Sequence, residues 1–139
     1  MPALIDTDVA VELMRHNPFA LDCVANFNEA VFISSITASE LYFGAYNSAH
    51  PDENAHKAKE FIESFTVLTI TSETARIFGR MKAMLRRQST QVAPFDLMIA
   101  AIALENGCAV ATGNVRHFRN IGELHLIDWI RGACTGRVQ

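Results

Sequence analysis

Features that mark secreted, membrane-embedded or repetitive proteins are scarce in this sequence. Only three of its 139 residues are cysteines, and they stand far apart at Cys23, Cys108 and Cys134 without a CxxC pair. This spacing predicts buried, reduced thiols rather than a disulfide framework or a structural zinc site. The longest apolar run, residues 97–104, is too short to span a bilayer, and the N-terminus lacks the basic stretch of a signal peptide. These absences predict a cytoplasmic protein.

Linkers, low-complexity tracts and internal repeats are also missing, and the glycines and prolines are scattered singly. Half of the residues are hydrophobic and 19% are charged, a profile typical of a compact globule. The net charge of −3 combines an acidic part (residues 1–75, eleven acids and three bases) with a basic part (residues 76–139, four acids and nine bases). We therefore expect a single domain, residues 1–139, with one surface suited to an anionic partner and another suited to a cation.

Short apolar segments alternate with longer, helix-like segments along the chain. Apolar and often β-branched runs predict strands at residues 3–5, 31–33, 67–70, 109–111 and 124–127. Apolar periodicity and capping residues predict helices near residues 9–14, 18–28, 39–46, 55–65, 72–88 and 96–106. This alternation predicts the α/β class, with a mainly parallel central sheet covered by helices on both faces.

Three acidic residues occupy similar places in this pattern. Asp6 follows the first strand, Glu40 lies at the start of the helix after the second strand, and Asp96 opens an otherwise apolar helix. Ligands of an open parallel sheet bind outside the carboxyl ends of its strands. Helices that follow strands begin at that edge, so Asp6 and Glu40 are expected to meet there. The spacing leaves open whether the Asp96 helix starts at the same edge.

Carboxylates that lie within a few ångströms repel each other unless a cation joins them. Mg²⁺ and Mn²⁺ prefer such oxygen ligands, and the chemistry that follows is metal-assisted phosphodiester hydrolysis. The alternative is that each acid caps a helix or interacts with its dipole, which is the commoner role of a single acid at a helix start. Asp8 fits this second role, as a cap for a helix that begins at Val9.

Four segments carry a resemblance to a known family: LIDTDVAVELM, SSITASELYFGA, PFDLMIAAIALENG and VATGNVRHF. In order and spacing they resemble PIN-domain ribonucleases, and most of all the VapC-type toxins of type II toxin–antitoxin pairs. The match runs over about residues 3–129 and leaves a C-terminal tail, residues 130–139. The resemblance implies a PIN-like three-layer α/β/α sandwich and a Mg²⁺-dependent endoribonuclease, in which Mn²⁺ can substitute.

The resemblance also implies a role for individual residues. Asp6, Glu40 and Asp96 match the acidic positions of the family, where Asp6 and Asp96 hold Mg²⁺ and Glu40 binds it or orients the attacking water. Thr112 and Asn114 match a polar Thr-x-Asn step that positions water or a phosphate oxygen. In-line attack then leaves a 5′-phosphate and a 3′-hydroxyl, and cleavage of tRNA, rRNA or mRNA inhibits translation.

Other positions of the motif are weaker or depart from it. Ser39 matches a common small hydroxyl, and His117 falls where relatives often carry another acid, with contact to the metal left open. Because Asn114 and His117 are not acidic, the case for a tightly bound second metal is weakened. Ser89 stands in a loop where relatives often have glycine.

The resemblance implies two kinds of macromolecular partner. An RNA backbone is expected along basic side chains, of which Arg116 is the best placed; the others are Arg76, Arg80, Lys82, Arg86, Arg87 and Arg119. A VapB-type antitoxin helix is expected on an apolar strip left over from a largely buried set of aromatic residues, Phe19, Phe27, Tyr42, Phe43 and Tyr46. A homodimer or a toxin–antitoxin hetero-oligomer is expected as well.

Two other functions compete with this interpretation. LIDTDV also fits the start of haloacid-dehalogenase-type phosphatases, with Asp6 as nucleophile and Asp8 as general acid, but the lysine and late acidic pair of that family are missing. Asp8→Ala would abolish such a phosphatase and leave a PIN nuclease largely active. The second alternative is a catalytically silent PIN-fold scaffold, which would show no Mn²⁺-dependent rise in melting temperature.

Overall fold

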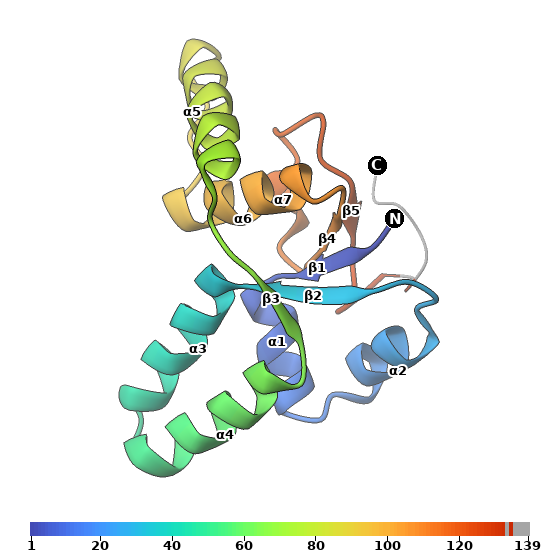
Figure 1. Cartoon of the computed structure of the whole chain (residues 1–139). Coiled ribbons are helices and arrows are strands. Elements are labelled where there is room, and N and C mark those ends of the chain that lie inside the picture. Colours follow the sequence, from blue (N-terminus) through green and yellow to red (C-terminus); the bar gives the residue numbers. More distant parts are fainter. Residues whose placement is uncertain (133, 135–139) are drawn as a thin grey trace.

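A computed structural model describes residues 1–132 and residue 134. In this part of the chain the elements follow in the order β1 (Ala3–Ile5), α1 (Thr7–Met14), α2 (Pro18–Asn26), β2 (Val31–Ser34), α3 (Ser35–Tyr46), α4 (Pro51–Glu63), β3 (Thr66–Leu68), α5 (Ser72–Arg87), α6 (Pro94–Glu105), β4 (Ala109–Ala111), α7 (Val115–Phe118) and β5 (Leu126–Ile127) (Figure 1). The predicted alternation of strands and helices is confirmed. Within the described residues, no helix is both long enough and apolar enough to cross a membrane.

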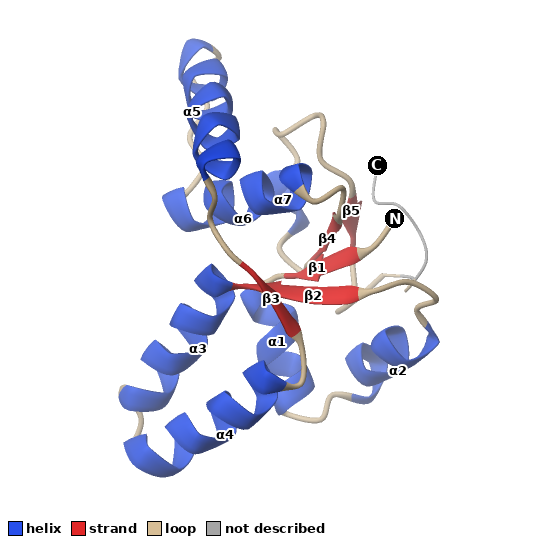
Figure 2. Ribbon diagram, in the orientation of Figure 1, coloured by secondary structure: helices blue, strands red, loops and turns tan. Residues whose placement is uncertain are grey.

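The strands form one five-stranded sheet in the order β3-β2-β1-β4-β5, and every neighbouring pair is parallel (Figure 2). In the central strand β1, Ile5 lies opposite Ile33 of β2 and opposite Ala111 of β4. The carboxyl ends of these three strands therefore share one edge of the sheet. Asp6 and Thr112 are the first residues beyond that edge on β1 and β4.

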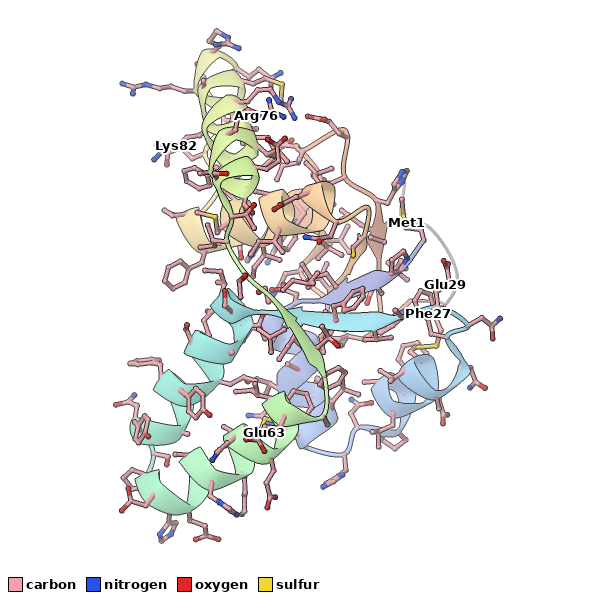
Figure 3. The ribbon with its side chains drawn as sticks, in the orientation of Figure 1. Met1, Phe27, Glu29, Glu63, Arg76 and Lys82 are labelled. Atoms are coloured by element: carbon pink, nitrogen blue, oxygen red, sulfur yellow. A yellow bond between two sulfur atoms is a disulfide. The ribbon has the colours of Figure 1, made fainter. Side chains whose placement is uncertain are left out.

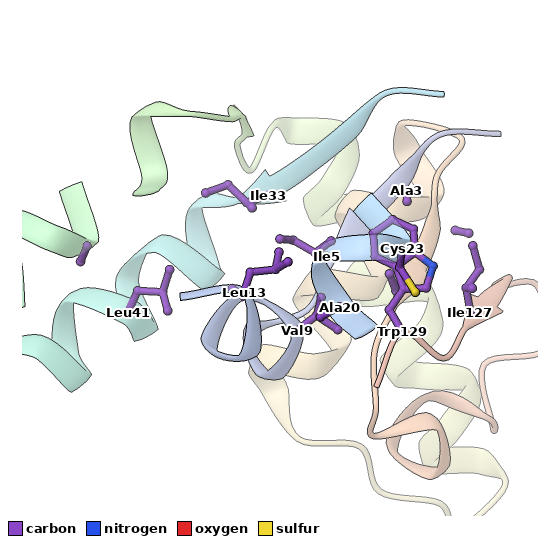
Figure 4. Packing of buried hydrophobic residues seen from close by; sticks show 14 of the residues in the cluster. Ala3, Ile5, Val9, Leu13, Ala20, Cys23, Ile33, Leu41, Ile127 and Trp129 are labelled. Carbon is purple, nitrogen blue, oxygen red and sulfur yellow. The ribbon is translucent and has the colours of Figure 1, made fainter. Parts of the chain in front are cut away.

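Side chains of the strands alternate between two hydrophobic cores, as a period of two residues requires. Ala3 and Ile5 belong to the core that includes α1, α2, α3 and α4, whereas Leu4 belongs to the core that includes α5, α6 and α7. Figure 4 shows Ile5 in the first core beside Val9 of α1. Helices therefore cover both faces of the sheet (Figure 1), and the predicted three-layer α/β/α architecture is confirmed.

Local sequence signals account for the beginning and end of several helices. Helix α5 begins with a capping box, in which Thr74 N donates to Thr71 Oγ1 at 3.2 Å and Thr71 N donates to Thr74 Oγ1 at 2.9 Å. Gly107 follows α6 with a φ of 64°, and Ser89 follows α5 with a φ of 55°. A left-handed backbone suits glycine and costs free energy for residues with a Cβ. Ser89 is therefore a strained position.

Some element boundaries differ from those predicted. Helix α1 begins at Thr7 rather than at residue 9, because the Asp6 side chain accepts from Thr7 N and supplies the N-cap. Helix α4 begins at Pro51, inside a stretch that looked like a polar loop, since proline is well suited to the first turn of a helix. Strands β3 and β5 are shorter than their apolar runs, at Thr66–Leu68 and Leu126–Ile127.

The prediction of three reduced thiols is wrong for two of the cysteines. Cys23 of α2 and Cys134 form a disulfide across 111 positions of sequence, and Cys108 is free and buried. The chain after β5 returns to α2: Trp129 Nε1 donates to Cys134 O at 2.8 Å, and the Trp129 ring meets the Phe27 ring edge-on at 5.2 Å. A long separation along the sequence therefore did not prevent these two cysteines from forming a disulfide. Of the predicted tail 130–139, residues 133 and 135–139 lie outside the described residues.

Aromatic side chains of α3 are more exposed than predicted. Phe43 is 70% exposed and Tyr46 is 61% exposed, whereas Phe19, Phe27 and Tyr42 pack partly against the core. Figure 1 shows the reason: the hairpin of α3 and α4 extends away from the sheet, so its outer faces have no layer to cover them.

Candidate active site

Asp6 lies at the carboxyl edge of the central strand, where both neighbouring strands help to hold it. Its backbone N–H donates to Ala111 O at 2.9 Å, which extends the β1–β4 pairing by one residue. Its carboxylate accepts from Thr7 N at 2.8 Å and from the Thr112 hydroxyl at 2.9 Å. Asp6 is only 5% exposed and forms no ion pair with any described residue. A buried carboxylate is thus fixed in orientation while its charge has no cationic side chain beside it.

This environment raises the pKa of Asp6 to about 7. Burial is the main cause, and the nearby carboxylates of Asp8 and Asp96 add to it. The hydrogen bonds from Thr112 and Thr7 act in the opposite direction and lower the pKa. A cation at this edge would relieve the repulsion, because it would favour the charged form of every carboxylate near it.

Asp96 lies in the first turn of α6, and the structure resolves which edge of the sheet that turn approaches. Its contact with His117 places it near the carboxyl end of β4. Asp96 Oδ2 is 3.4 Å from His117 Nδ1, and His117 belongs to the short helix that follows β4. Helix α6 has Ala93 at its N-cap and no side-chain capping bond, so Asp96 is not the cap of this helix. Burial raises the pKa of Asp96, and the neighbouring His117 partly offsets that rise.

Glu40 reaches the same region through threonine hydroxyls. Its Oε1 accepts from the Thr7 hydroxyl at 2.8 Å, and Thr7 Oγ1 lies 3.1 Å from the Thr37 hydroxyl. Because Thr7 directly follows Asp6, this bond holds the Glu40 side chain of α3 beside the start of α1.

The turn after β4 supplies the neutral polar groups of the site. Thr112 is fully buried; its hydroxyl donates to Asp6 and accepts from Asn114 N at 2.9 Å. Asn114 is the N-cap residue of α7, yet its side chain makes no capping bond. The predicted Thr-x-Asn step therefore lies next to Asp6, with the Asn114 side chain not used to cap the helix.

Asp8 is not the helix cap that was predicted, because it lies in the first turn of α1 and Asp6 is the N-cap residue. Its carboxylate accepts from Val9 N and from Gly113 N, both at 2.8 Å, and lies 3.4 Å from the Thr112 hydroxyl. It thereby links the first turn of α1 to the turn after β4. A Cβ on Gly113 would lie 3.0 Å from Asp8 Oδ2 and 2.6 Å from Ile130 Cδ1, so a larger residue there would force these side chains to shift. In the sequence, the D-x-D spacing of LIDTDV was the signal that Asp8 lies near Asp6.

The remaining predicted residues lie in different surroundings. Ser39 is exposed, and its hydroxyl donates to Ser35 O at 2.8 Å, so it is engaged with its own helix rather than with the acids. Arg116 is exposed on α7, where it helps to line a cavity beside Asn114. His117 contacts Asp96 through its side chain.

The donor set suits a hard divalent cation. Asp6 and Asp96 provide carboxylate oxygens, and burial is the main cause of the raised pKa of each acid. Mg²⁺ is commonly held by one or two carboxylates together with waters and substrate phosphates. In the described part of the chain, no three His, Cys, Asp or Glu side chains converge as a ready-made metal cage. Participation of Glu40 as a third ligand remains a prediction.

Two of the seven basic residues predicted to follow an RNA backbone form ion pairs with neighbouring acids. On α5, Arg76 pairs with Glu73 and Arg80 pairs with Glu123 at 2.8 Å. Figure 3 shows Arg76 and Lys82 of α5 on the opposite side of the sheet from Glu63 of α4, and Lys82 Nζ lies 5.6 Å from the centre of the Phe78 ring. Ion-paired arginines attract an anionic partner less than unpaired ones do.

Comparisons with known proteins agree with this geometry. The sequence matches the PIN domain family over residues 3–124. It is 33% identical over 127 residues to the tRNA(fMet)-specific endonuclease VapC of Shigella flexneri, which covers 91% of this chain and 96% of that protein. DNA-bound VapBC from Salmonella typhimurium has a TM-score of 0.80 at 31% identity and covers 93% of this chain and 98% of that one.

A second solved structure supports the fold alone. VapBC2 from Rickettsia felis, bound to a DNA fragment from their promoter, has a TM-score of 0.87 at 23% identity, over 93% of this chain and 99% of that one. The sequence match, the parallel sheet and the acids at its carboxyl edge are all consistent with the same family. The chain therefore belongs to the PIN-domain family and, within it, to the VapC group.

Proposed function

We propose that this chain is a metal-dependent endoribonuclease that acts as the toxin of a type II toxin–antitoxin pair and inhibits translation by hydrolysing RNA. The observation that supports this most is the position of Asp6: buried at the carboxyl edge of the central strand and hydrogen-bonded by Thr112 at 2.9 Å. Such an arrangement suits metal-assisted attack on a phosphodiester. Because the relative from Shigella flexneri is named a tRNA(fMet)-specific endonuclease, tRNA is the first substrate to test.

Each residue of the edge has a distinct part in this reaction. Asp6 and Asp96 would hold Mg²⁺, or Mn²⁺ in its place, while Glu40 binds the ion or accepts a proton from the attacking water. An ion held there would supply a coordinated water of lowered pKa and positive charge for the transferring phosphate. The Thr112 hydroxyl keeps the Asp6 carboxylate in one orientation, and the Asn114 side chain can donate to a phosphate oxygen. Cleavage would leave a 5′-phosphate and a 3′-hydroxyl.

Cleavage of total cellular RNA by the purified protein tests the activity. Wild type, Asp6→Asn and Asp96→Asn are compared with Mg²⁺, with Mn²⁺ and with EDTA, and Asp52→Asn in the exposed first turn of α4 is the matched control. We expect discrete metal-dependent fragments from wild type and the control, and none from the two site variants. Equal cleavage by all four proteins would contradict the proposed site.

A catalytically silent scaffold predicts a different result for metal binding. A ligand that binds only the folded state raises its melting temperature. We expect Mn²⁺ to raise the melting temperature of the wild type and not that of Asp6→Asn. If neither protein responds and neither cleaves RNA, the scaffold function is favoured instead.

A VapB-type antitoxin is the expected protein partner. A cavity of 260 Å³ between α1, α3 and α4 is lined in part by Val11, Met14 and Leu41, and the exposed Phe43 lies on α3. An amphipathic helix suits such a surface, because its apolar residues recur every three to four positions. We expect Phe43→Ser to lose co-purification with a co-expressed VapB-type antitoxin and to retain RNA cleavage. Leu21→Ser, at an exposed leucine of α2, is the control.

The phosphatase alternative receives no support from the surroundings of Asp8. A general acid must reach the leaving group, whereas both Asp8 oxygens already accept backbone N–H groups of Val9 and Gly113. The carboxylate is therefore engaged in tying two turns together.

A further inference from the structure

Three arginines from two segments converge on one cavity beside the active site. The cavity has a volume of 360 Å³, and the residues that line it are Gly113, Asn114, Val115, Arg116, Arg119, Asp128 and Arg131. The first five follow β4 and the last two follow β5, so the cavity lies at the carboxyl edge where those neighbouring strands end.

The charge of this cavity is not compensated. Its side chains carry three positive charges and one negative charge, a balance of +2. Among the described residues neither Arg116 nor Arg119 forms an ion pair, in contrast to Arg76 and Arg80 of α5. The single acid, Asp128, is occupied by the turn after β5, where its Oδ1 accepts from the backbone N–H groups of the second and third residues that follow it at 2.9 and 2.8 Å.

The cavity continues directly from the acidic site. Gly113 N donates to Asp8, and Asn114 N donates to the Thr112 hydroxyl that holds Asp6. On the other side, Arg131 Nη1 approaches Gly113 O at 3.5 Å. One short turn therefore has the carboxylates on one flank and the guanidinium groups on the other.

We propose that this arginine pocket binds a backbone phosphate of the RNA next to the phosphate that is cleaved. The inference rests on the proposed ribonuclease function and adds a defined substrate-binding site to it. Guanidinium groups bind phosphate oxygens through paired N–H donors, and phosphate contacts fix the register of a nucleic acid on a protein. With the carboxylates at the adjacent flank, a phosphate in the pocket holds the strand so that the neighbouring phosphodiester lies over Asp6 and Asp96.

The test compares Arg119→Ala, Arg131→Ala and the double variant with wild type on a short single-stranded RNA that contains a mapped cleavage site. Lys59→Ala removes one positive charge from the exposed face of α4, where Lys59 pairs with Glu63, and is the matched control. We expect KM to rise at least about tenfold in the double variant while kcat stays within about twofold of wild type, because the contact affects substrate binding. The control should keep both constants.

Binding provides a second measurement that does not depend on cleavage. Fluorescence anisotropy of the same RNA is measured with each variant in EDTA over a range of salt concentrations. For single strands, each lost phosphate contact lowers the slope of log K against log salt by about 0.7. Arg119→Lys should retain most of the slope, since charge is kept while the paired donors are lost. Among the described residues, the Arg119 side chain forms no hydrogen bond or ion pair. Arg119→Ala should therefore fold normally, and it can be used alone if Arg131→Ala is destabilised.

The outcomes separate this proposal from the proposed function. An unchanged affinity and salt slope in the double variant would overturn the phosphate site. A fall in kcat with unchanged KM would also overturn it, since the arginines would then act on the reaction itself. If inorganic phosphate raises the melting temperature in an arginine-dependent way while RNA affinity does not change, the pocket binds a small anion instead. Arginine-dependent RNA binding without cleavage by wild type would support the pocket and reject the nuclease.

Discussion

The hydroxyl of Thr112 donates to Asp6 Oδ2 at 2.9 Å, across 106 positions of sequence. This bond joins the end of β4 to the end of β1 and lowers the pKa of a carboxylate that burial raises. The neutral residue thereby keeps the acid charged over a wider pH range, and with the bond from Thr7 N it fixes the orientation of the carboxylate.

Replacing this hydroxyl should affect the acid limb of the pH profile. In Thr112→Val the hydrogen bond is lost, so the pKa of Asp6 rises further and the decline of kcat/KM on the acid side moves to higher pH. We expect roughly a tenfold loss of activity near neutral pH, the scale of about one pKa unit. Thr66→Val, at an exposed threonine of β3, is the control and should leave the profile in place.

The pKa of Asp6 has a consequence for stability without metal. An acid whose pKa is about 7 in the folded protein and 3.8 in the unfolded chain binds a proton on folding between these values. Stability therefore falls as pH rises from about 4 to about 7. Burial shifts the pKa values of Asp8 and Asp96 in the same direction, so their effects add.

Thermal unfolding in EDTA checks this expectation. The wild type should melt at a lower temperature at pH 8 than at pH 5.5, and Asp6→Asn should melt at least about 3 °C higher than wild type at pH 8. Asparagine retains an acceptor for Thr7 N, so the N-cap is kept. A wild type that is equally stable at both pH values would contradict the raised pKa.

The left-handed backbone at Ser89 predicts a stabilising substitution. Its φ of 55° costs free energy in serine and none in glycine, so Ser89→Gly should increase the free energy of unfolding by up to about 1 kcal/mol. Urea unfolding monitored by circular dichroism measures the difference. Ser64→Gly is the control, because Ser64 has a right-handed φ of −76° and glycine there should give no gain.

The disulfide predicts a pattern of thiol reactivity. When the protein is unfolded without reductant and alkylated, mass spectrometry should detect one modified cysteine, Cys108; with reductant it should detect three. Cys23→Ala should lower the free energy of unfolding under non-reducing conditions by about 2 to 4 kcal/mol, since the closed loop is long. The variant should no longer respond to reductant, which separates loss of the disulfide from other effects of the reducing agent.

Much of the fold follows from local patterns in the sequence. Short apolar runs bounded by polar residues predict the strands, and the Thr71 capping residue marks the start of α5. Once a parallel sheet is predicted, Asp6 and the helix of Glu40 are expected at a common edge, and no knowledge of tertiary contacts is needed. The position of Asp96 required the resemblance to the family, because nothing local to α6 reveals at which edge of the sheet it begins.

What the sequence did not predict depends on contacts between distant segments. Asp8 resembles a helix cap when only its neighbours are considered, and its bond to Gly113 N appears once β4 lies beside β1. Cys23 and Cys134 meet because the chain after β5 folds back onto α2. Phe43 is a large apolar residue of the kind usually found in a core. It is exposed because the hairpin of α3 and α4 extends away from the sheet. Local propensity carries no information about such packing.

Strand β1 is paired on both sides, by β2 and by β4, and both of its faces are covered by helices. Its amide hydrogens can exchange with solvent only when the whole domain opens, in contrast to those of the edge strands. Asp6, the acid that directly follows this strand, is therefore held in position for as long as the domain stays folded. Local opening of this strand is therefore not a way to regulate the site, whereas an occupant of the surface above Asp6 could regulate it.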